Sequence, residues 1–299
     1  MQRIVITGAG GLIGSRLSGM LSDEGFDVVH LTRNKTKGDN YKSFMWDPDA
    51  GICDADAFNE GDIIIHLAGA NIGEKRWSPE RKREILDSRI KSAGLLSAAT
   101  IEKGILPSAF ISASATGIYG SVISQRIFTE NDPPASDFLG ETCRLWEAAA
   151  DPFEAAGIRV VKIRTSVVLA PGGSALSKLR APAAAGMIIR FAPGHQFFPW
   201  IHIDDLCQVY RKAVADAGMT GIFNAVSPEH ITHDMLMREI AKQKRLPVFL
   251  PCIPEWLARL MLGEMSVVIT TGSRVSCDKL TLTGFEFRFP DIRSALKAC

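Results

Sequence analysis

The sequence has little of several features that mark particular classes of protein. No stretch approaches the ~18 uncharged apolar residues of a membrane-spanning helix, and the opening "MQRIVITGAGG" has no apolar core long enough for a secretory signal. Lys and Arg number 34 against 33 Asp and Glu, so the formal net charge is only +1. With no field of one sign, we expect no nucleic-acid partner and no membrane partner. The lack of a secretory signal and of a membrane span predicts a cytoplasmic location.

Cysteine patterns are missing as well. The six cysteines are widely scattered, and none forms a CxxC pair or a metal-ligand spacing with a histidine. We therefore predict reduced thiols and no metal site.

Short apolar runs rich in β-branched residues alternate with longer helical patterns. Runs that are apolar on both faces are typical of parallel strands covered by helices. The alternation predicts an α/β fold with a doubly wound parallel sheet. The expected strands are 3–7, 27–32, 62–69, 109–115 and 159–169, and the expected helices are 12–24, 78–103 and 138–156.

A glycine-rich segment, "TGAGGLIG", joins the first expected strand to the first expected helix. Gly8, Gly11 and Gly14 follow each other at three-residue spacing, with Gly10 as an extra. In such a turn the first glycine allows tight reversal, the second lets the main chain approach a pyrophosphate, and the third lets the helix pack on the strand. The helix N-terminus offers unpaired N–H groups to the phosphates. The context predicts a dinucleotide site of the Rossmann type that also includes Leu12 and Ile13.

The second expected strand ends about 20 residues after the glycines, where the adenosine ribose lies in such folds. An Asp or Glu there accepts hydrogen bonds from both ribose hydroxyls and selects NAD. This chain has Arg33 instead, with Lys35 close by. A guanidinium pairs with a 2′-phosphate in a fork geometry, so the sequence predicts NADP(H) as cofactor. The alternative is a solvated surface charge pair.

The amino-acid composition changes after about residue 170. The Ala, Gly and Pro-rich stretch 181–196 predicts a long connection, and 200–214 predicts a strand followed by a helix that Asp204 or Asp205 caps. We expect a Rossmann domain over 1–168, to which 200–226 returns. Residues 169–199 and 227–299 are expected to form a smaller C-terminal α/β lobe.

Together with the glycines, "HLAGANI" (66–72), "ISASATGIYG" (111–120) and "WIHIDDL" (200–206) resemble the extended short-chain dehydrogenase/reductases, a group that includes nucleotide-sugar epimerases. The segments "EKRWSPERKREILDSRIKSAGLL" (74–96) and "GHQFFPWIHIDDL" (194–206) resemble one atypical branch, the epimerase family proteins. The resemblance implies a Rossmann domain, NADP(H) binding and a small C-terminal lobe. Further cofactor contacts are expected at Leu67, Ala68, Gly69 and Arg89, with a surface salt bridge as the alternative for Arg89.

The chain departs from the superfamily where catalysis is concerned. Typical members use a Tyr, a Lys four residues later and a Ser, and Ser114 matches that serine. Aligning "DFLGETCRLWE" on Glu147 puts Leu139 where the Tyr is expected and Cys143 where the Lys is expected. Leu139 cannot move a proton and a neutral thiol supplies no cation, so the usual pair is absent.

Other residues are candidates for proton transfer beside Ser114. Tyr119 follows on the same strand-end loop, although packing on the sheet is the alternative. Glu141 is a candidate base or a solvated helix carboxylate. Cys143 becomes a candidate nucleophile if Arg144 or a helix N-terminus lowers its pKa.

We expect His195, Gln196 and Trp200 to meet a small substrate from the second lobe. The leading interpretation is an NADP(H)-binding oxidoreductase or epimerase that acts on an unidentified small substrate, with nucleotide sugars among the candidates. The alternative is a non-catalytic NADP(H) sensor that acts through a partner. We expect a monomer or a homodimer.

Overall fold

The computed structural model describes residues 1–33, 40–182, 188–246 and 252–299. Lys35 therefore lies outside the described residues. An eight-stranded sheet forms the centre, in the order β12-β8-β6-β5-β1-β2-β3-β4. Its neighbours are parallel except for the antiparallel pair β3 and β4. The strands are β1 (Arg3–Thr7), β2 (Asp27–Thr32), β3 (Lys42–Asp47), β4 (Ile52–Cys53), β5 (Ile63–His66), β6 (Ala109–Ala115), β8 (Arg159–Thr165) and β12 (Gly221–Ala225).

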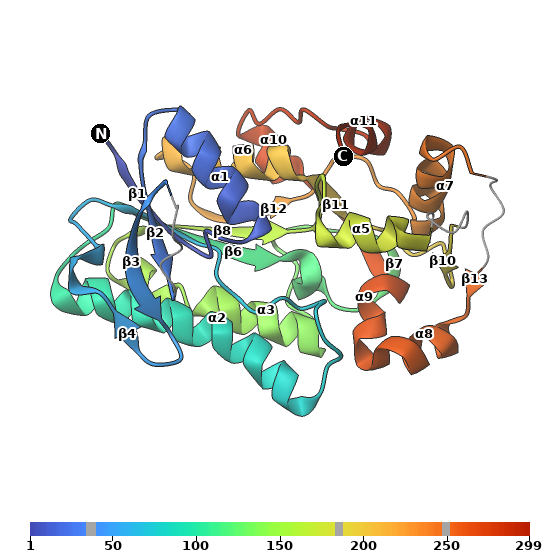
Figure 1. Cartoon of the computed structure of the whole chain (residues 1–299), viewed down its shortest axis with the longest axis horizontal. Helices are drawn as coiled ribbons and strands as arrows, with labels where there is room; N and C mark the ends of the chain where they lie inside the picture. The colour runs from blue at the N-terminus through green and yellow to red at the C-terminus, as the bar shows by residue number, and fades with distance from the viewer. Residues whose placement is uncertain (34–39, 183–187, 247–251) are drawn as a thin grey trace.

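Helices cover both faces of this sheet, as Figure 1 shows. On one face lie α1 (Leu12–Asp23), α6 (Ile203–Ala215) and α10 (Asp278–Leu282). On the other face lie α2 (Pro79–Thr100) and α3 (Phe138–Ala148). The predicted doubly wound parallel sheet is thus confirmed.

Alternate side chains of the central strands enter two separate cores. Ile4 and Ile6 pack with Leu17 of α1, while Val5 between them packs with Leu96 of α2. All five of these strand and helix positions are fully buried, which explains why the strand sequences are apolar throughout.

The order of the strands reverses at β1. The chain runs outward from β1 through β2 and β3 to β4 and then returns to β5 on the other side of β1. In open α/β sheets such a switch point forms a crevice at the carboxyl ends of the strands. Here those ends are the turn after Thr7 and the segment after His66.

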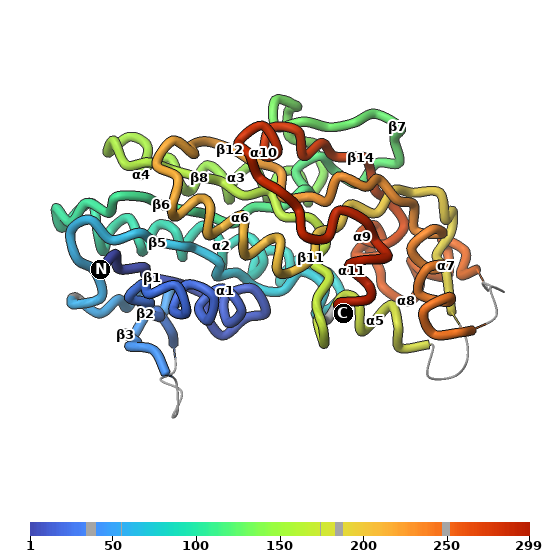
Figure 2. Tube along the Cα trace, turned by 90° about the horizontal axis from the view of Figure 1, so that it is seen from above, coloured from blue at the N-terminus to red at the C-terminus, as the bar shows by residue number. Residues whose placement is uncertain are grey.

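A smaller group of elements lies together at one end of the molecule (Figures 1 and 2). It contains α5 (Ser174–Arg180), β10 (Arg190–Phe191), α7 (His233–Gln243), β13 (Cys252–Ile253), α8 (Glu255–Leu262) and α9 (Val267–Thr270). Two further strand pairs connect it with the first part of the chain: β9 (Val167–Leu169) with β11 (Trp200–His202), and β7 (Ile123–Phe128) with β14 (Gly272–Val275). The remaining elements are α4 (Asp151–Ala155), α11 (Ile292–Ala298), and the 3-10 turns η1 (Ala55–Ala57), η2 (Ile101–Lys103), η3 (Thr116–Tyr119) and η5 (Gly263–Ser266).

The C-terminal residues contribute to both parts of the molecule. β12 is hydrogen-bonded to β8 in the main sheet, and Leu280 and Phe285 pack into the core beside α1 and α6. Ile292 and Leu296 instead pack with α7 in the smaller group. The predicted division into two domains stays a prediction.

Some predicted boundaries were wrong for identifiable reasons. The single helix expected over 138–156 is two helices, since Pro152 has no N–H to continue the ladder of α3. The strand expected over 159–169 is interrupted at Ser166.

The predicted cap of α6 is also wrong. His202 is the N-cap, and its Nδ1 accepts a hydrogen bond from the backbone N–H of Asp204 at 3.2 Å. The buried carboxylate of Asp205 instead accepts the backbone N–H groups of Arg288 and Phe289 at 2.8 and 3.0 Å. These two hydrogen bonds hold the segment at Arg288 and Phe289 against α6. Within the described parts of the chain, no helix is both long and apolar enough to cross a membrane.

Two glycines of α1 make a matched test of the packing. A Cβ on Gly14 would lie 2.4 Å from the carbonyl oxygen of Gly8, whereas one on Gly19 would meet nothing within 4 Å. We expect Gly14→Ala to lower the free energy of unfolding by about 1–3 kcal/mol, as overpacking does. Gly19→Ala should raise it by about 0.5–1 kcal/mol through helix propensity. Urea unfolding followed by circular dichroism measures both, and equal effects of the two substitutions would contradict this packing.

Candidate functional site

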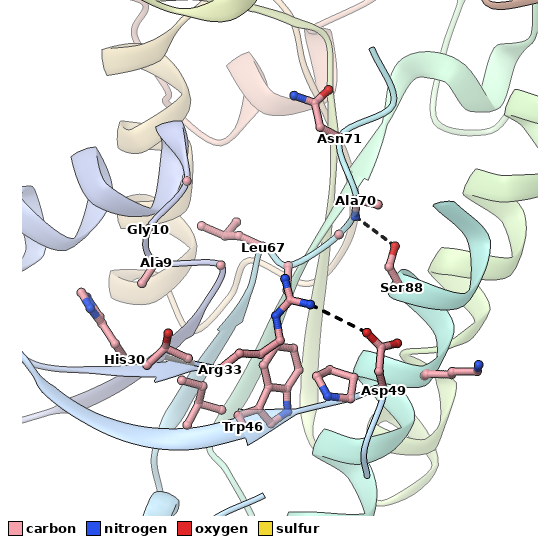
Figure 3. Close-up of a pocket in the computed structure, with 18 of the residues that line it drawn as sticks. Ala9, Gly10, His30, Arg33, Trp46, Asp49, Leu67, Ala70, Asn71 and Ser88 are labelled. Carbon is pink, nitrogen blue, oxygen red and sulfur yellow. Dashed lines mark hydrogen bonds and ion pairs between the residues drawn. The ribbon is translucent and has the colours of Figure 1, made fainter. Parts of the chain in front are cut away.

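A cleft of about 880 Å³ opens at the switch point of the sheet. Figure 3 shows residues from the turn after β1, the end of β2, the segment after β5 and helix α2 around it. The cleft brings together seven of the predicted cofactor residues: Gly8, Gly10, Gly11, Arg33, Leu67, Ala68 and Gly69. Leu12, Ile13 and Gly14 form the first turn of α1 directly behind the glycine loop.

The glycine loop has the geometry that its sequence predicts. Gly8 has φ +69°, and a Cβ there would lie 2.9 Å from the backbone nitrogen of Ala68. The Gly11 N–H donates to the Gly8 carbonyl oxygen at 3.0 Å, which closes the turn. A Cβ on Gly10 would meet nothing within 4 Å, so this position is open.

The N-terminus of α1 has no side-chain cap. Gly11 is its N-cap, and among the described residues no side chain caps the first turn with a hydrogen bond. Backbone N–H groups at such an end, with the positive end of the helix dipole, favour a phosphate. The loop and helix therefore fit the pyrophosphate of a dinucleotide.

A buried hydrogen-bond network, which the sequence did not indicate, holds the segment after β5 against the end of β1. The Thr7 Oγ1 accepts the N–H groups of Leu67 and Ala68, both at 3.2 Å, and lies 2.8 Å from Nδ1 of His66. The other ring nitrogen of His66 lies 3.0 Å from the hydroxyl of Ser92 on α2. Burial lowers the pKa of His66 to about 3, so the ring is neutral and can accept at one nitrogen and donate at the other.

Arg33 follows the last residue of β2 and lines the cleft. Its guanidinium lies 3.8 Å from the carboxylate of Asp49, and both side chains are mostly exposed (Figure 3). Asp49 belongs to the turn between β3 and β4 and was not among the predicted residues.

Arg89 lies beneath the cleft rather than in its lining. Its side chain is 8% exposed and donates from Nη1 to the carbonyl oxygens of Ala70 at 3.2 Å and Ile85 at 2.7 Å. The guanidinium carbon also lies 4.6 Å from the ring centroid of Trp146 on α3. This burial contradicts the alternative of a surface salt bridge. A direct role in cofactor binding stays a prediction.

Ser114 is part of a buried ion-pair network. Its hydroxyl donates to Oε1 of Glu147 at 2.7 Å. Arg164 on β8 donates to both oxygens of the same carboxylate, at 2.8 and 3.0 Å. All three residues are at most 8% exposed. The serine hydroxyl is therefore committed to a structural hydrogen bond.

Tyr119 belongs to the same network. Its hydroxyl donates to the Asn224 side-chain oxygen at 2.6 Å and accepts from Nη1 of Arg164 at 3.0 Å. Burial raises the pKa of Tyr119 to about 12. The ring is 3% exposed and stacks with Phe128. These contacts support the packing alternative and give no support to proton transfer by Tyr119.

Cys143 and Glu141 have environments that oppose their predicted roles. Burial, reinforced by the nearby Glu147, raises the pKa of the Cys143 thiol to about 12. Arg144 donates two hydrogen bonds to Glu141, at 2.8 and 2.6 Å, instead of activating Cys143. Those bonds hold the pKa of Glu141 below its usual range. Neither residue is poised for nucleophilic or base chemistry near neutral pH.

A second cavity, of about 270 Å³, lies between the start of α3 and the elements α8, η5 and α9. Leu139, the residue at the expected Tyr position, lines it together with Trp77 and Phe138. The polar residues of its lining are Ser121, Asp137, Glu255, Arg259, Glu264, Ser266, Thr270 and Thr271.

The three predicted substrate residues line neither of these cavities. Trp200 is fully buried in the core beside α7, and Gln196 is 1% exposed and donates to the carbonyl oxygen of Ile269 at 2.9 Å. His195 is exposed. A substrate role for them stays a prediction that this geometry does not support. Across the described ranges, no group of three His, Cys, Asp or Glu side chains could hold a metal ion.

Two carboxylates on α3 test the buried network. Glu147→Gln should leave the Arg164 guanidinium buried without its counter-charge and lower the free energy of unfolding by about 3–5 kcal/mol. Glu141→Gln, the same change at an exposed pair, should leave it nearly unchanged. Chemical denaturation measures both, and a small effect of Glu147→Gln would contradict the role given to the pair.

Comparison with known proteins agrees with this architecture. The sequence model of the NAD dependent epimerase/dehydratase family matches residues 4–225, and a domain of unknown function, DUF1731, matches residues 253–299. The chain is 35% identical over 301 residues to the epimerase family protein YfhF of Bacillus subtilis, covering 99% of this chain and 97% of that protein. It is 32% identical over 294 residues to the epimerase family protein Mb2239 of Mycobacterium bovis, covering 98% and 96% respectively.

Solved structures have the same fold. The crystal structure of the human epimerase family protein SDR39U1 with NADPH superposes with a TM-score of 0.88 at 27% identity, covering 99% of this chain and 98% of that one. MoeE5, solved with UDP-glucose and NAD, gives a TM-score of 0.81 at 20% identity, covering 99% and 96%. The family expected from the motifs is confirmed: the chain belongs to the NAD dependent epimerase/dehydratase family, and within it to the epimerase family proteins.

Proposed function

We propose that this chain binds NADP(H) in the 880 Å³ cleft and acts as an oxidoreductase or epimerase on a small substrate held in the second cavity. One observation carries the proposal. The open glycine loop, the uncapped N-terminus of α1 and the cation of Arg33 all line or adjoin the same cleft. The human relative that was solved with NADPH supports the choice of cofactor.

Each part of the cleft would bind a different part of the cofactor. The N–H groups at the start of α1 would bind the pyrophosphate, and Arg33 would pair with the 2′-phosphate. The main chain of Leu67, Ala68 and Gly69, held by Thr7, would run along the cofactor. When bound, the nicotinamide supplies hydride chemistry.

In this proposal the protein holds the cofactor and the substrate in place, and none of its side chains donates a proton to the substrate. Ser114, Tyr119 and Cys143 are buried, and the two hydroxyls are engaged in hydrogen bonds within the fold. Reduction of a carbonyl leaves an alkoxide, and we propose that this alkoxide takes its proton from water in the second cavity. Such a reaction would need no Tyr and Lys pair.

The alternative function, a sensor of NADP(H), is favoured by a separate observation. The loop over 71–77 borders the cleft through Asn71 and Glu74 and also contacts the smaller group of helices. Lys178 of α5 donates to the Gly73 carbonyl oxygen at 2.8 Å, and Arg76 donates to that of Leu260 at 2.9 Å. A cofactor that moved this loop would also move those helices. A partner protein that binds to the helices could then distinguish the cofactor-bound form from the free form.

The role of Arg33 is tested by reversing its charge. Arg33→Asp should weaken NADPH binding about tenfold or more, because it removes charge-assisted hydrogen bonds to the 2′-phosphate, and should affect NADH far less. Arg83→Asp is the matched control, since Arg83 is exposed on α2 and does not line the cleft. Isothermal titration calorimetry gives each dissociation constant. An unchanged preference for NADPH in Arg33→Asp would overturn this assignment.

The enzymatic proposal is tested by following the hydride. NADPH deuterated at the nicotinamide C4 is incubated with the protein and a cell metabolite extract, and mass spectrometry detects labelled metabolites. A parallel run that starts from NADP⁺ is followed by the formation of NADPH. The same extract without the protein is the control. Protein-dependent label in a metabolite is the expected result and identifies the substrate. Tight NADPH binding with no transfer in either run would contradict the enzyme and favour the sensor.

A further inference from the structure

The turn between β3 and β4 places a carboxylate beside the cation that would hold the 2′-phosphate. Asp49 and Arg33 line the same cleft, and their charged groups lie 3.8 Å apart (Figure 3). Their side chains are 72% and 67% exposed, so both stand in water at the rim. Any group that binds Arg33 from the cleft meets Asp49 as well.

The position of Asp49 is fixed by its own turn. Oδ1 of Asp47 accepts the backbone N–H of Asp49 at 3.0 Å and that of Ala50 at 3.4 Å. Gly51 then adopts φ +67°, a conformation that side chains rarely permit. The local hydrogen bonds therefore hold residue 49 at the rim independently of Arg33.

The carboxylate has opposite effects on the two dinucleotides. A 2′-phosphate carries a charge of about −1.5 to −2 near neutral pH, and it must replace Asp49 as the partner of Arg33 while lying close to a like charge. An NAD(H) ribose has a 2′-hydroxyl instead, which can donate a hydrogen bond to a carboxylate. Arg33 thus favours NADP(H), and Asp49 opposes it.

We propose that Asp49 is a specificity-determining residue that limits the preference for NADP(H) over NAD(H). This inference rests on the proposed binding of NADP(H) in the cleft. The pair of opposite charges gives the protein a moderate preference, which a neutral residue at position 49 would sharpen.

The test is Asp49→Asn in the full-length chain, with dissociation constants for NADPH and NADH measured by calorimetry. An exposed charge pair at this distance is weak, so we expect NADPH to bind about threefold more tightly and NADH not to gain. Competition with 2′,5′-ADP and 5′-AMP isolates the ribose end and should show the same change in their ratio. The gain should shrink in high salt, where exposed charges are screened.

Asp56→Asn is the matched control, because it removes the same charge from an exposed residue of η1 that does not line the cleft. An equal gain in that variant would mean a general effect of net charge and would overturn the inference. An unchanged ratio in Asp49→Asn would also overturn it while leaving the proposed function intact. If the unaltered chain bound neither dinucleotide, the proposed function itself would fail, and the inference with it.

Discussion

The ion pair between Glu147 and Arg164 determines what the rest of this site can do. It joins α3 to β8 in the interior, where an unpaired charge is costly. The carboxylate also accepts a hydrogen bond from the hydroxyl of Ser114, and the guanidinium donates one to the hydroxyl of Tyr119. Although burial alone would lower it, the hydrogen bonds to Glu147 raise the pKa of Arg164, which stays a cation. The hydroxyls of Ser114 and Tyr119, which the sequence offers as candidates for catalysis, are thereby engaged within the fold.

The cleft at the switch point is formed by other residues than the network around Glu147 and Arg164. It lies at the switch point of the sheet, where Thr7 and His66 hold the segment after β5 against the glycine loop. No proton-transfer residue is needed to shape it. The cleft at the switch point is therefore shaped independently of the buried network around Ser114 and Tyr119.

The sequence was most informative where one residue type satisfies a local geometric need. The glycines and the apolar strands predicted the sheet and the cleft, because only glycine suits the turn at Gly8 and the close contact at Gly14. The sequence could not show that Ser114 and Tyr119 are engaged, because their partners Glu147, Arg164 and Asn224 come from distant segments. Asp49 was missed for the same reason, since its proximity to Arg33 depends on the pairing of β2 with β3. His66 was missed as well, because its partners Thr7 and Ser92 come from other elements.

The most direct test of the central claim is a crystal structure of the chain with NADPH. We predict the pyrophosphate at the N-terminus of α1, the 2′-phosphate within hydrogen-bonding distance of Arg33, and the hydroxyl of Ser114 still hydrogen-bonded to Glu147. NADPH bound elsewhere, or with Ser114 released from Glu147 and turned toward the nicotinamide, would contradict it.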